Sequence, residues 1–223
     1  MSQEIRPSPT VEDYLGIIYT LARDNEPVIG RKLAEWMEVS PPTVTATIQR
    51  MVRDGWVTMA PDKTIHLTDA GRRAAASLVR RHMLTELLLA RVLNVPWSRV
   101  HEEADLLEHN LSPETAARVA ELLEHTNVCP HGNPLPGQES SVSDLIPLLE
   151  ASPGQTYRLA RVHEEIERHG DLMDYFEQHG LVPGVQLEFV QVLPANETVT
   201  VVVDGRDVAL GLAVARCLWV QKI

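Results

Sequence analysis

Residues 40–53 read Ser-Pro-Pro-Thr-Val-Thr-Ala-Thr-Ile-Gln-Arg-Met-Val-Arg and predict the short helix around which the fold is organised. Ser40 suits the N-cap, and the prolines after it fall at the first helical positions, where a missing N–H costs nothing. One face of this helix is polar and rich in hydroxyls, and the helix ends in arginines, which is typical of the second helix of a helix-turn-helix. The positions expected to be buried are Val44, Ile48, Met51 and Val52.

The segments around this helix complete the pattern. Residues 28–39 predict a preceding helix, and residues 56–68 alternate around a turn at 61–63, which predicts a β-hairpin. Further back, Thr10 reads as the N-cap of a first helix, with Asp13 at its N3 position. Helix, helix, helix and hairpin in this order indicate a winged helix-turn-helix. The inward side chains are expected to be Leu33, Ala34 and Met37 in the second helix and Val57, Met59, Ile65 and Leu67 in the hairpin.

A winged helix-turn-helix predicts contacts with double-stranded DNA. We expect hydroxyls of the 40–53 helix to reach base edges in the major groove, while Arg50 and Lys63, at the tip of the hairpin, contact phosphates. The predicted DNA-contacting residues are Ser40, Pro42, Thr43, Thr45, Thr47, Arg50 and Lys63.

A second informative stretch, residues 101–109, reads His-Glu-Glu-Ala-Asp-Leu-Leu-Glu-His. On a helix that turns about 100° per residue, its metal-capable side chains His101, Asp105, Glu108 and His109 share one face. Val100, Ala104, Leu107 and Leu111 form a separate apolar stripe. The preceding helix adds His82 and Glu86, which are neighbours at i and i+4. Imidazoles and carboxylates in this number predict one divalent-cation site, and a second beside it.

Residues 101–109 are also compatible with roles that need no regulatory cation. Their side chains could form an ordinary solvated helix face, or the ligands of a metallohydrolase. The spacing fits catalysis poorly, because the zinc-protease motif needs a second His at i+4, where Asp105 stands. Di-iron bundles need repeated Glu-x-x-His, whereas Glu108 and His109 are adjacent in this chain. A winged helix that responds to a small molecule is a further alternative.

Composition places the chain among globular proteins. Its 223 residues are 44% hydrophobic, yet none of the apolar runs approaches the roughly 20 residues of a membrane span. Residues 1–6 lack the apolar core of a signal peptide, so we expect a cytoplasmic protein without a membrane partner. Cys129 and Cys217 are far apart, which argues against a disulfide framework or a zinc ribbon.

Charge is distributed unevenly between the two halves. The formal net charge is −11, but residues 1–82 carry 11 Lys and Arg against 10 Asp and Glu, which leaves 9 against 21 for the rest. The acidity is therefore C-terminal, which suggests that only the N-terminal part meets a polyanion. The apolar surface of the central helices predicts a homodimer.

After the Pro- and Gly-rich residues 129–137, the pattern changes to short strands. Alternation at 157–162, 185–192, 197–203, 208–210 and 219–223, with a helix at 171–179 and a helical turn at 212–217, predicts a small β-barrel. Cys129 and His131 are weak candidates as ligands, because no second pair lies nearby in sequence. A solvated acidic face is the favoured interpretation of His163, Glu164, Glu165, His169 and Asp171.

Taken together, the motifs resemble the diphtheria-toxin-repressor family of metal-dependent transcriptional repressors, in particular its manganese transport regulators. The motifs that carry the resemblance are residues 40–45, 67–71, 81–86, 101–109 and 132–137. The resemblance implies a mainly α protein with a small β domain. Its expected parts are a winged helix-turn-helix at 1–75, a helical metal-binding and dimerisation domain at 76–140, a linker at 141–152 and an SH3-like (ferrous-transport-A-like) barrel at 153–223.

The resemblance also implies two cation sites per subunit and no enzyme activity. By position, a primary site would comprise Asp13, Asp105, Glu108 and His109, and an ancillary site His82, Glu86 and His101. Iron-responsive members carry Met and Cys where this chain has Asp13 and Asp105, so Mn²⁺ is the expected cation and Fe²⁺ the close alternative. Ala46 stands where those members have a Gln, so the operator sequence does not transfer. In the barrel, His169 and Leu172 stand where Glu and Gln ligands would.

Overall fold

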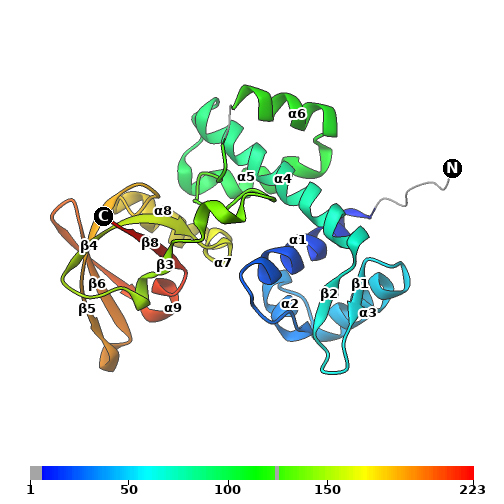
Figure 1. Ribbon diagram of the computed structural model, residues 1–223, viewed down its shortest axis with the longest axis horizontal. Helices are drawn as coiled ribbons and strands as arrows, with labels where there is room; N and C mark the ends of the chain where they lie inside the picture. Colours follow the sequence, from blue (N-terminus) through cyan, green and yellow to red (C-terminus); the bar gives the residue numbers. More distant parts are fainter. Residues whose placement is uncertain (1–6, 124–125) are drawn as a thin grey trace. The chain divides into compact units, whose positions relative to one another are not determined.

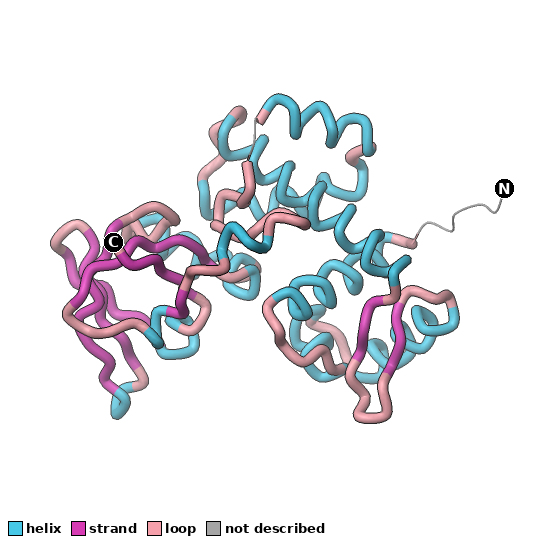
Figure 2. Tube along the Cα trace, in the orientation of Figure 1, coloured by secondary structure: helices cyan, strands magenta, loops and turns pink. Residues whose placement is uncertain are grey.

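The computed structural model describes residues 7–123 and 126–223. The chain divides into two compact units between Arg81 and His82, and each is described by itself. Ser112-Pro-Glu-Thr predicts the start of a helix that continues to His125. His125 and residues 1–6, which are predicted to lack a signal peptide, lie outside the described residues. Figures 1 and 2 show the helices and strands along the chain.

The first unit is a winged helix-turn-helix, as predicted. It contains α1 (Pro9–Arg23), α2 (Gly30–Met37), α3 (Pro41–Arg53), β1 (Val57–Met59), β2 (Ile65–Leu67) and the start of α4 (Asp69–Arg91). The two strands pair antiparallel, with Thr58 opposite His66, and form the hairpin that follows α3 in Figure 1. The core of this unit includes Leu15, Ile18, Leu33, Ile48, Met51, Val57 and Ile65.

Some of the predicted core positions are wrong. Val52 is 40% and Met59 54% exposed, because the short hairpin and the last turn of α3 have one covered side only. In α2, Trp36 is buried while Ala34 and Met37 are only half-buried. The large indole occupies the inward position that the periodicity assigned to Met37.

The predicted cap of α1 is also wrong. The helix begins at Pro9 with Ser8 as its N-cap, so Thr10 lies inside the helix and Asp13 in its second turn. Proline prefers the first helical position, where its fixed φ is already helical, and this preference outweighs the capping tendency of Thr10. Asp13 therefore has no role as the N3 residue of a capping box.

Thr68 joins the hairpin to α4. Its Oγ1 donates to Gly55 O at 2.7 Å and accepts from Gly71 N at 3.0 Å, so it caps the new helix. A Cβ atom at Gly71 would stand 2.0 Å from Trp56 O. The motif at 67–71 is thus structural: it fixes where α4 leaves the winged domain.

The second unit begins with the rest of α4 and three shorter helical stretches. These are η1 (Trp97–Arg99), α5 (Val100–Leu107) with η2 (Glu108–Asn110), and α6 (Pro113–Leu122). The predicted helix through His109 is therefore wrong at its end, since the backbone tightens into a 3-10 turn after Leu107. Val100 and Ala104 are buried against Leu89, whereas Leu107 of the predicted stripe is 46% exposed.

The C-terminal part of this unit is the predicted small barrel. Its sheet has the order β3-β8-β4-β5-β6-β7. The strands are β3 (Ile146–Pro147), β4 (Gln155–Val162), β5 (Gln186–Leu193), β6 (Thr198–Val203), β7 (Arg206–Gly211) and β8 (Leu218–Lys222), and the helices are α7 (Glu164–Glu167), α8 (Gly170–Gln178) and α9 (Leu212–Ala215); short 3-10 turns lie at Glu139–Val142, Leu148–Glu150 and Pro194–Asn196. The core holds Leu159, Phe176, Phe189, Val201 and Leu218. The sequence patterns did not predict β3 or α7.

Glu177 on α8 connects the barrel to the helical segment. Its Oε1 accepts from Trp97 N at 2.9 Å and its Oε2 from Ser98 Oγ at 2.7 Å. The carboxylate thus accepts hydrogen bonds from donors at the start of η1, the turn that leads directly into α5.

Among the helices that the structure describes, none combines the length and the apolar character of a membrane span.

Candidate metal centre

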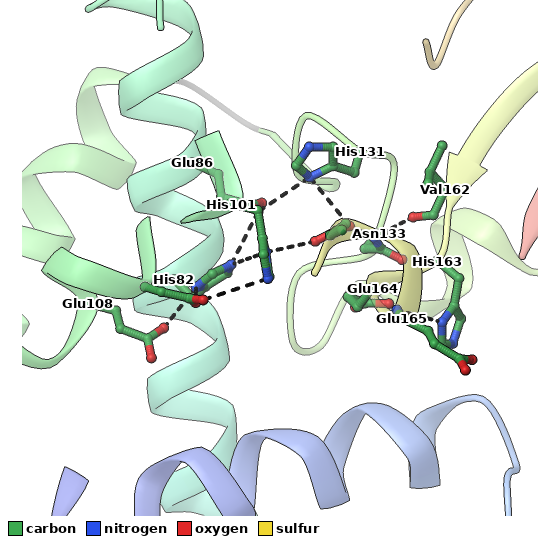
Figure 3. Close-up of polar contacts among 12 residues, drawn as sticks. His82, Glu86, His101, Glu108, His131, Asn133, Val162, His163, Glu164 and Glu165 are labelled. Atoms are coloured by element: carbon green, nitrogen blue, oxygen red, sulfur yellow. Dashed lines mark hydrogen bonds and ion pairs between the residues drawn. The ribbon is translucent and has the colours of Figure 1, made fainter. Parts of the chain in front are cut away.

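The predicted ancillary residues converge on one point between α4 and α5. Glu86 Oε1 lies 3.2 Å from His82 Nε2 and 3.3 Å from His101 Nδ1, and the two imidazole nitrogens are 3.1 Å apart (Figure 3). His82 and Glu86 face the same side because they are one helical turn apart. The structure therefore brings all three predicted ancillary residues together.

A fourth residue, with a second carboxylate, comes from the barrel. Glu167, at the end of α7, places Oε2 3.0 Å from His101 Nδ1 and is 4% exposed. His82, Glu86, His101 and Glu167 offer ligand atoms that all lie within 4.8 Å of one another. Two buried carboxylates are costly unless a cation or protonated imidazoles compensate them.

The loop 129–137 supplies two more candidates. His131 is fully buried, and its Nδ1 lies 3.3 Å from both Glu86 Oε1 and Glu167 Oε1. Cys129, Glu86 and His131 form a second group of possible ligands. The lack of a second pair nearby in sequence therefore does not exclude Cys129 and His131, because Glu86 reaches them from α4 in three dimensions.

Trp97 holds this loop against the helical segment. Its Nε1 donates to Pro130 O at 3.0 Å, and its ring meets the His131 ring edge-on with centroids 4.8 Å apart. His131 Nε2 lies 3.3 Å from Trp97 O, so the ring orientation leaves Nδ1 directed at the carboxylates. The indole and the imidazole thus form one packed pair beside the cluster.

The cluster fits a divalent cation. Within residues 7–123 and 126–223, Glu86 Oε2 and His131 Nδ1 are buried and have no hydrogen-bond partner. Two donor atoms that share an ion at about 2.1 Å lie about 3.0 to 3.4 Å apart in octahedral or tetrahedral geometry. The separations between neighbouring donor atoms of the cluster, 3.0 to 3.3 Å, match this range.

The charges of the cluster compensate one another. Burial alone would lower the pKa of His101, but hydrogen bonds to Glu167 and Glu86 outweigh it and raise the pKa to about 10. The pKa values of His82 and His131 are raised in the same way, against burial, by neighbouring carboxylates. Burial would raise the pKa of Glu86, but the imidazoles of His131 and His82 hold it well below its usual range. The imidazoles and carboxylates of the cluster thus stabilise one another's charged forms.

Cys129 behaves differently. Burial, followed by the carboxylates of Glu86 and Glu167, raises the pKa of the Cys129 thiol well above its usual value. The sulfur is therefore a thiol, which is a poor ligand, unless a cation displaces its proton.

Three of the predicted primary residues, Asp105, Glu108 and His109, lie on the side of the other nitrogen of the His82 ring. His82 Nδ1 is 2.9 Å from Glu108 Oε2 and 3.3 Å from Asp105 Oδ1, while His109 Nε2 is 3.4 Å from Glu108 Oε1. The side chain of Asp105 is 56% exposed and Glu108 is buried. Asp13, the fourth predicted primary residue, belongs to the other unit, so its place in this set stays a prediction.

Sequence reasoning missed Glu167. It lies in the acidic run 163–171, for which the pattern favours a solvated face, and Ile166 and Glu167 are the buried residues of α7. His163 in the same run is buried, and its Nδ1 accepts from Glu165 N as the cap of α7. A four-residue helix has too few turns for a periodicity to reveal which carboxylate points inward.

The predicted DNA-contacting residues lie on α3, at its start and on the hairpin. All are exposed except the half-buried Thr47. Ser40 Oγ and Thr43 Oγ1 are hydrogen-bonded to each other at 2.9 Å, and Thr45 Oγ1 donates to Pro41 O at 3.0 Å. These hydroxyls retain lone pairs as acceptors. Lys63, with a φ of 67°, lies in the turn of the hairpin.

Family comparisons cover most of the chain. Residues 8–65 match the iron dependent repressor N-terminal DNA binding domain, residues 68–137 the iron dependent repressor metal binding and dimerisation domain, and residues 146–222 the FeoA domain. The chain is 32% identical to the iron-dependent repressor IdeR of Mycobacterium tuberculosis over 96% of its length and 97% of the relative's. It is 39% identical to the diphtheria toxin repressor of Corynebacterium glutamicum over 96% of both.

Solved structures agree with these matches. A manganese-dependent transcriptional repressor in complex with manganese superposes with a TM-score of 0.82 at 31% identity, covering 96% of this chain and all of that one. The manganese regulator SloR superposes with a TM-score of 0.79 at 30% identity, covering 97% and all, respectively. The sequence matches, the domain order and the cluster on α4 and α5 lead to one conclusion: this chain belongs to the iron-dependent, diphtheria-toxin-repressor-like family of metal-dependent transcriptional repressors.

Proposed function

We propose that this protein is a Mn²⁺-activated repressor, with Fe²⁺ as the close alternative, and that each subunit binds two cations. The ancillary set is extended to His82, Glu86, His101 and Glu167 and the primary set is Asp13, Asp105, Glu108 and His109. The observation that carries the proposal is a buried cluster: among the described residues, Glu86 Oε2 has no hydrogen-bond partner, and His131 Nδ1 has no hydrogen bond but faces the carboxylates of Glu86 and Glu167 at 3.3 Å. The preference for Mn²⁺ rests on the carboxylates at Asp13 and Asp105.

The proposed consequence of cation binding is a gain in DNA affinity. A cation that binds the DNA-competent arrangement more tightly must raise DNA affinity by linkage. Operator DNA is proposed to be read by Ser40, Pro42, Thr43, Thr45, Thr47, Arg50 and Lys63, and a homodimer presents two such helices. The exposed Leu93, Leu106, Leu107 and Leu122 of the central helices support self-association. As a regulator of genomic DNA, the protein is proposed to act in the cytoplasm.

We also propose that the cations regulate rather than catalyse. Catalytic sites keep one coordination position open to substrate, whereas Glu86, Glu167 and His131 are each 4% exposed or less. The four segments 1–75, 76–140, 141–152 and 153–223 remain the proposed functional division of the chain.

The test is operator binding by the purified protein with Mn²⁺, with Fe²⁺ without oxygen, and with chelator. Glu86→Gln and His101→Ala should bind DNA weakly at cation concentrations that saturate the wild type. Glu102→Gln is the matched control, because Glu102 is on the same helix and its side chain is 64% exposed. DNA affinity that is the same with chelator and with Mn²⁺ would contradict the proposal.

A further inference from the structure

Asn133 is a fully buried side chain whose amide is oriented by three partners. Arg161 Nε can only donate, so the atom 2.5 Å from it must be Asn133 Oδ1. The carbonyl of Val162 can only accept, and Asn133 Nδ2 donates to it at 2.8 Å (Figure 3). The same Nδ2 donates to Glu167 Oε1. The orientation of the amide therefore follows from the chemistry of its neighbours.

The two carboxylate oxygens of Glu167 have different partners. Oε1 accepts from Asn133 Nδ2 and also lies 3.3 Å from His131 Nδ1, whereas Oε2 is the oxygen directed at His101 Nδ1, 3.0 Å away. A carboxylate whose one oxygen is held in this way offers the other to a cation at a fixed position. The amide thus orients the Glu167 carboxylate so that Oε2 faces His101.

Asn133 has little freedom to move. Val162 N donates to His131 O at 2.8 Å, and Cys129 N donates to Asn133 O at 2.8 Å. A Cβ atom at Gly132, which has a φ of 86°, would stand 2.0 Å from Ala160 O. Arg161 is fixed as well, with Nη2 3.2 Å from Glu164 Oε2 and its guanidinium 5.4 Å from the centre of the Trp219 ring. The loop and β4 therefore form one rigid support.

We propose that Asn133 is a positioning residue that orients Glu167 as a ligand of the cation, and that Arg161 holds Asn133 in this role. The inference rests on the proposed function, since it needs Glu167 to bind the cation. According to this proposal, the loop residue Asn133 and the barrel residue Arg161 affect cation affinity through the orientation of Glu167, and neither of them is a ligand.

A double-mutant cycle tests the proposal in the full-length protein. Mn²⁺ affinity is measured by calorimetry for wild type, Asn133→Ala, Glu167→Gln and the double variant. Asn133→Ala should weaken binding about 10- to 100-fold in the wild-type background and less than about twofold on Glu167→Gln, because Asn133 acts through Glu167. If the changes in Mn²⁺ binding free energy of the two single variants add up to that of the double variant, Asn133 does not act through Glu167, and the positioning role is overturned while the ligand role of Glu167 stands. Wild-type affinity in Glu167→Gln would overturn the ligand assignment as well.

Two further measurements separate positioning from folding. In the chelated protein, the midpoints of thermal unfolding of the same four proteins should also be non-additive, because the Asn133–Glu167 bond needs no cation. Arg161→Lys keeps the charge but lacks the Nε–H that orients the amide, so it should weaken Mn²⁺ binding in the same Glu167-dependent way. Gln138→Ala, exposed in the same loop region, should bind like the wild type. Additive midpoints, or Arg161→Lys with unchanged affinity, would overturn the proposal.

Discussion

His82 Nδ1 lies 2.9 Å from Glu108 Oε2, on the opposite edge of the ring from Glu86. A neutral imidazole has one N–H, and donation from Nδ1 to Glu108 leaves the Nε2 lone pair for a cation beside Glu86 and His101. Carboxylates that orient a ligand imidazole in this way also raise its basicity. One ring therefore links the proposed primary and ancillary sets.

We expect Glu108→Gln to weaken Mn²⁺ binding at both the primary and the ancillary set, which a titration should record as two steps. Loss of the carboxylate removes a proposed primary ligand and the orienting partner of His82, which should cost about 10- to 100-fold at the ancillary set. Glu167→Gln should weaken one step only. Calorimetry of the two variants checks this, with Glu103→Gln, exposed on α5, as the control. If Glu108→Gln weakens only one step, His82 does not depend on Glu108.

Cation affinity should rise with pH. The pKa of His101 is raised to about 10 in the cation-free protein, so binding at pH 7 must displace a proton from it. Calorimetry in buffers of different ionisation enthalpy should report this proton release, and His101→Gln should release fewer protons. Binding at pH 7 without any proton exchange would contradict the prediction.

The same pKa gives the cation-free protein a stability that depends on pH with a definite sign. The folded pKa of His101, about 10, lies above its unfolded value of about 6.5. The stabilisation is complete below the unfolded value and is lost as pH rises through the folded one. Urea unfolding of chelated protein should therefore show lower stability at pH 10 than at pH 6, and His101→Gln should reduce this difference.

Lys63→Ala should weaken operator binding equally on every sequence. A phosphate contact carries no base information and contributes about one unit to the salt slope. Fluorescence anisotropy with two operators at several salt concentrations checks this, and Lys222→Ala, an exposed lysine of the barrel, is the control. Thr43→Ala should instead change the ranking of the operators. A Lys63 variant with the wild-type salt slope would refute the assignment.

Asp13→Met combined with Asp105→Cys should shift activation away from Mn²⁺. Thioether and thiolate groups favour softer cations than carboxylates do. DNA binding measured across Mn²⁺, Fe²⁺ and Co²⁺ gives the ranking for both proteins. The same ranking in both would mean that the two aspartates do not set the cation preference.

Glu177→Ala should destabilise the second unit by about 2 kcal/mol, since two hydrogen bonds to a carboxylate are lost where η1 begins. Gln178→Ala, the exposed neighbour on α8, is the control. Unfolding in urea checks the change. Equal midpoints for the two variants would show that the docking of the barrel does not depend on Glu177.

Local patterns were enough to predict most of the architecture. The Ser40-Pro-Pro start of α3 and the alternation in β5 and β6 are both signals within a few residues, and both elements lie where they were expected. The first turn of α1 was misplaced because Ser8, Pro9 and Thr10 are all good start signals, and only one can be the cap. Choices of this kind depend on a balance of about 1 kcal/mol.

Periodicity alone could pair only those residues of the cation cluster that share a helix, and His101 on α5 was added by the family resemblance. His82 and Glu86 are one turn apart, so periodicity paired them. Glu167 and His131 reach the same point from the barrel and from a loop of irregular backbone. No local pattern encodes such a meeting, because it depends on how α8 and β4 are packed against the helical segment.

The edge-on contact between Trp97 and His131, with centroids 4.8 Å apart, gives the protein a built-in optical signal. A protonated imidazole in contact with an indole quenches the fluorescence of the indole. A cation bound by Glu86 and Glu167 would neutralise the carboxylates that favour protonated His131, so His131 would lose its proton. Manganese addition should therefore brighten the fluorescence of Trp97 in the native chain, without any dye. Because Trp36, Trp56 and Trp219 also emit, the difference from Trp97→Phe isolates the response. Stopped-flow recording of that difference would time the arrival of the cation at the cluster.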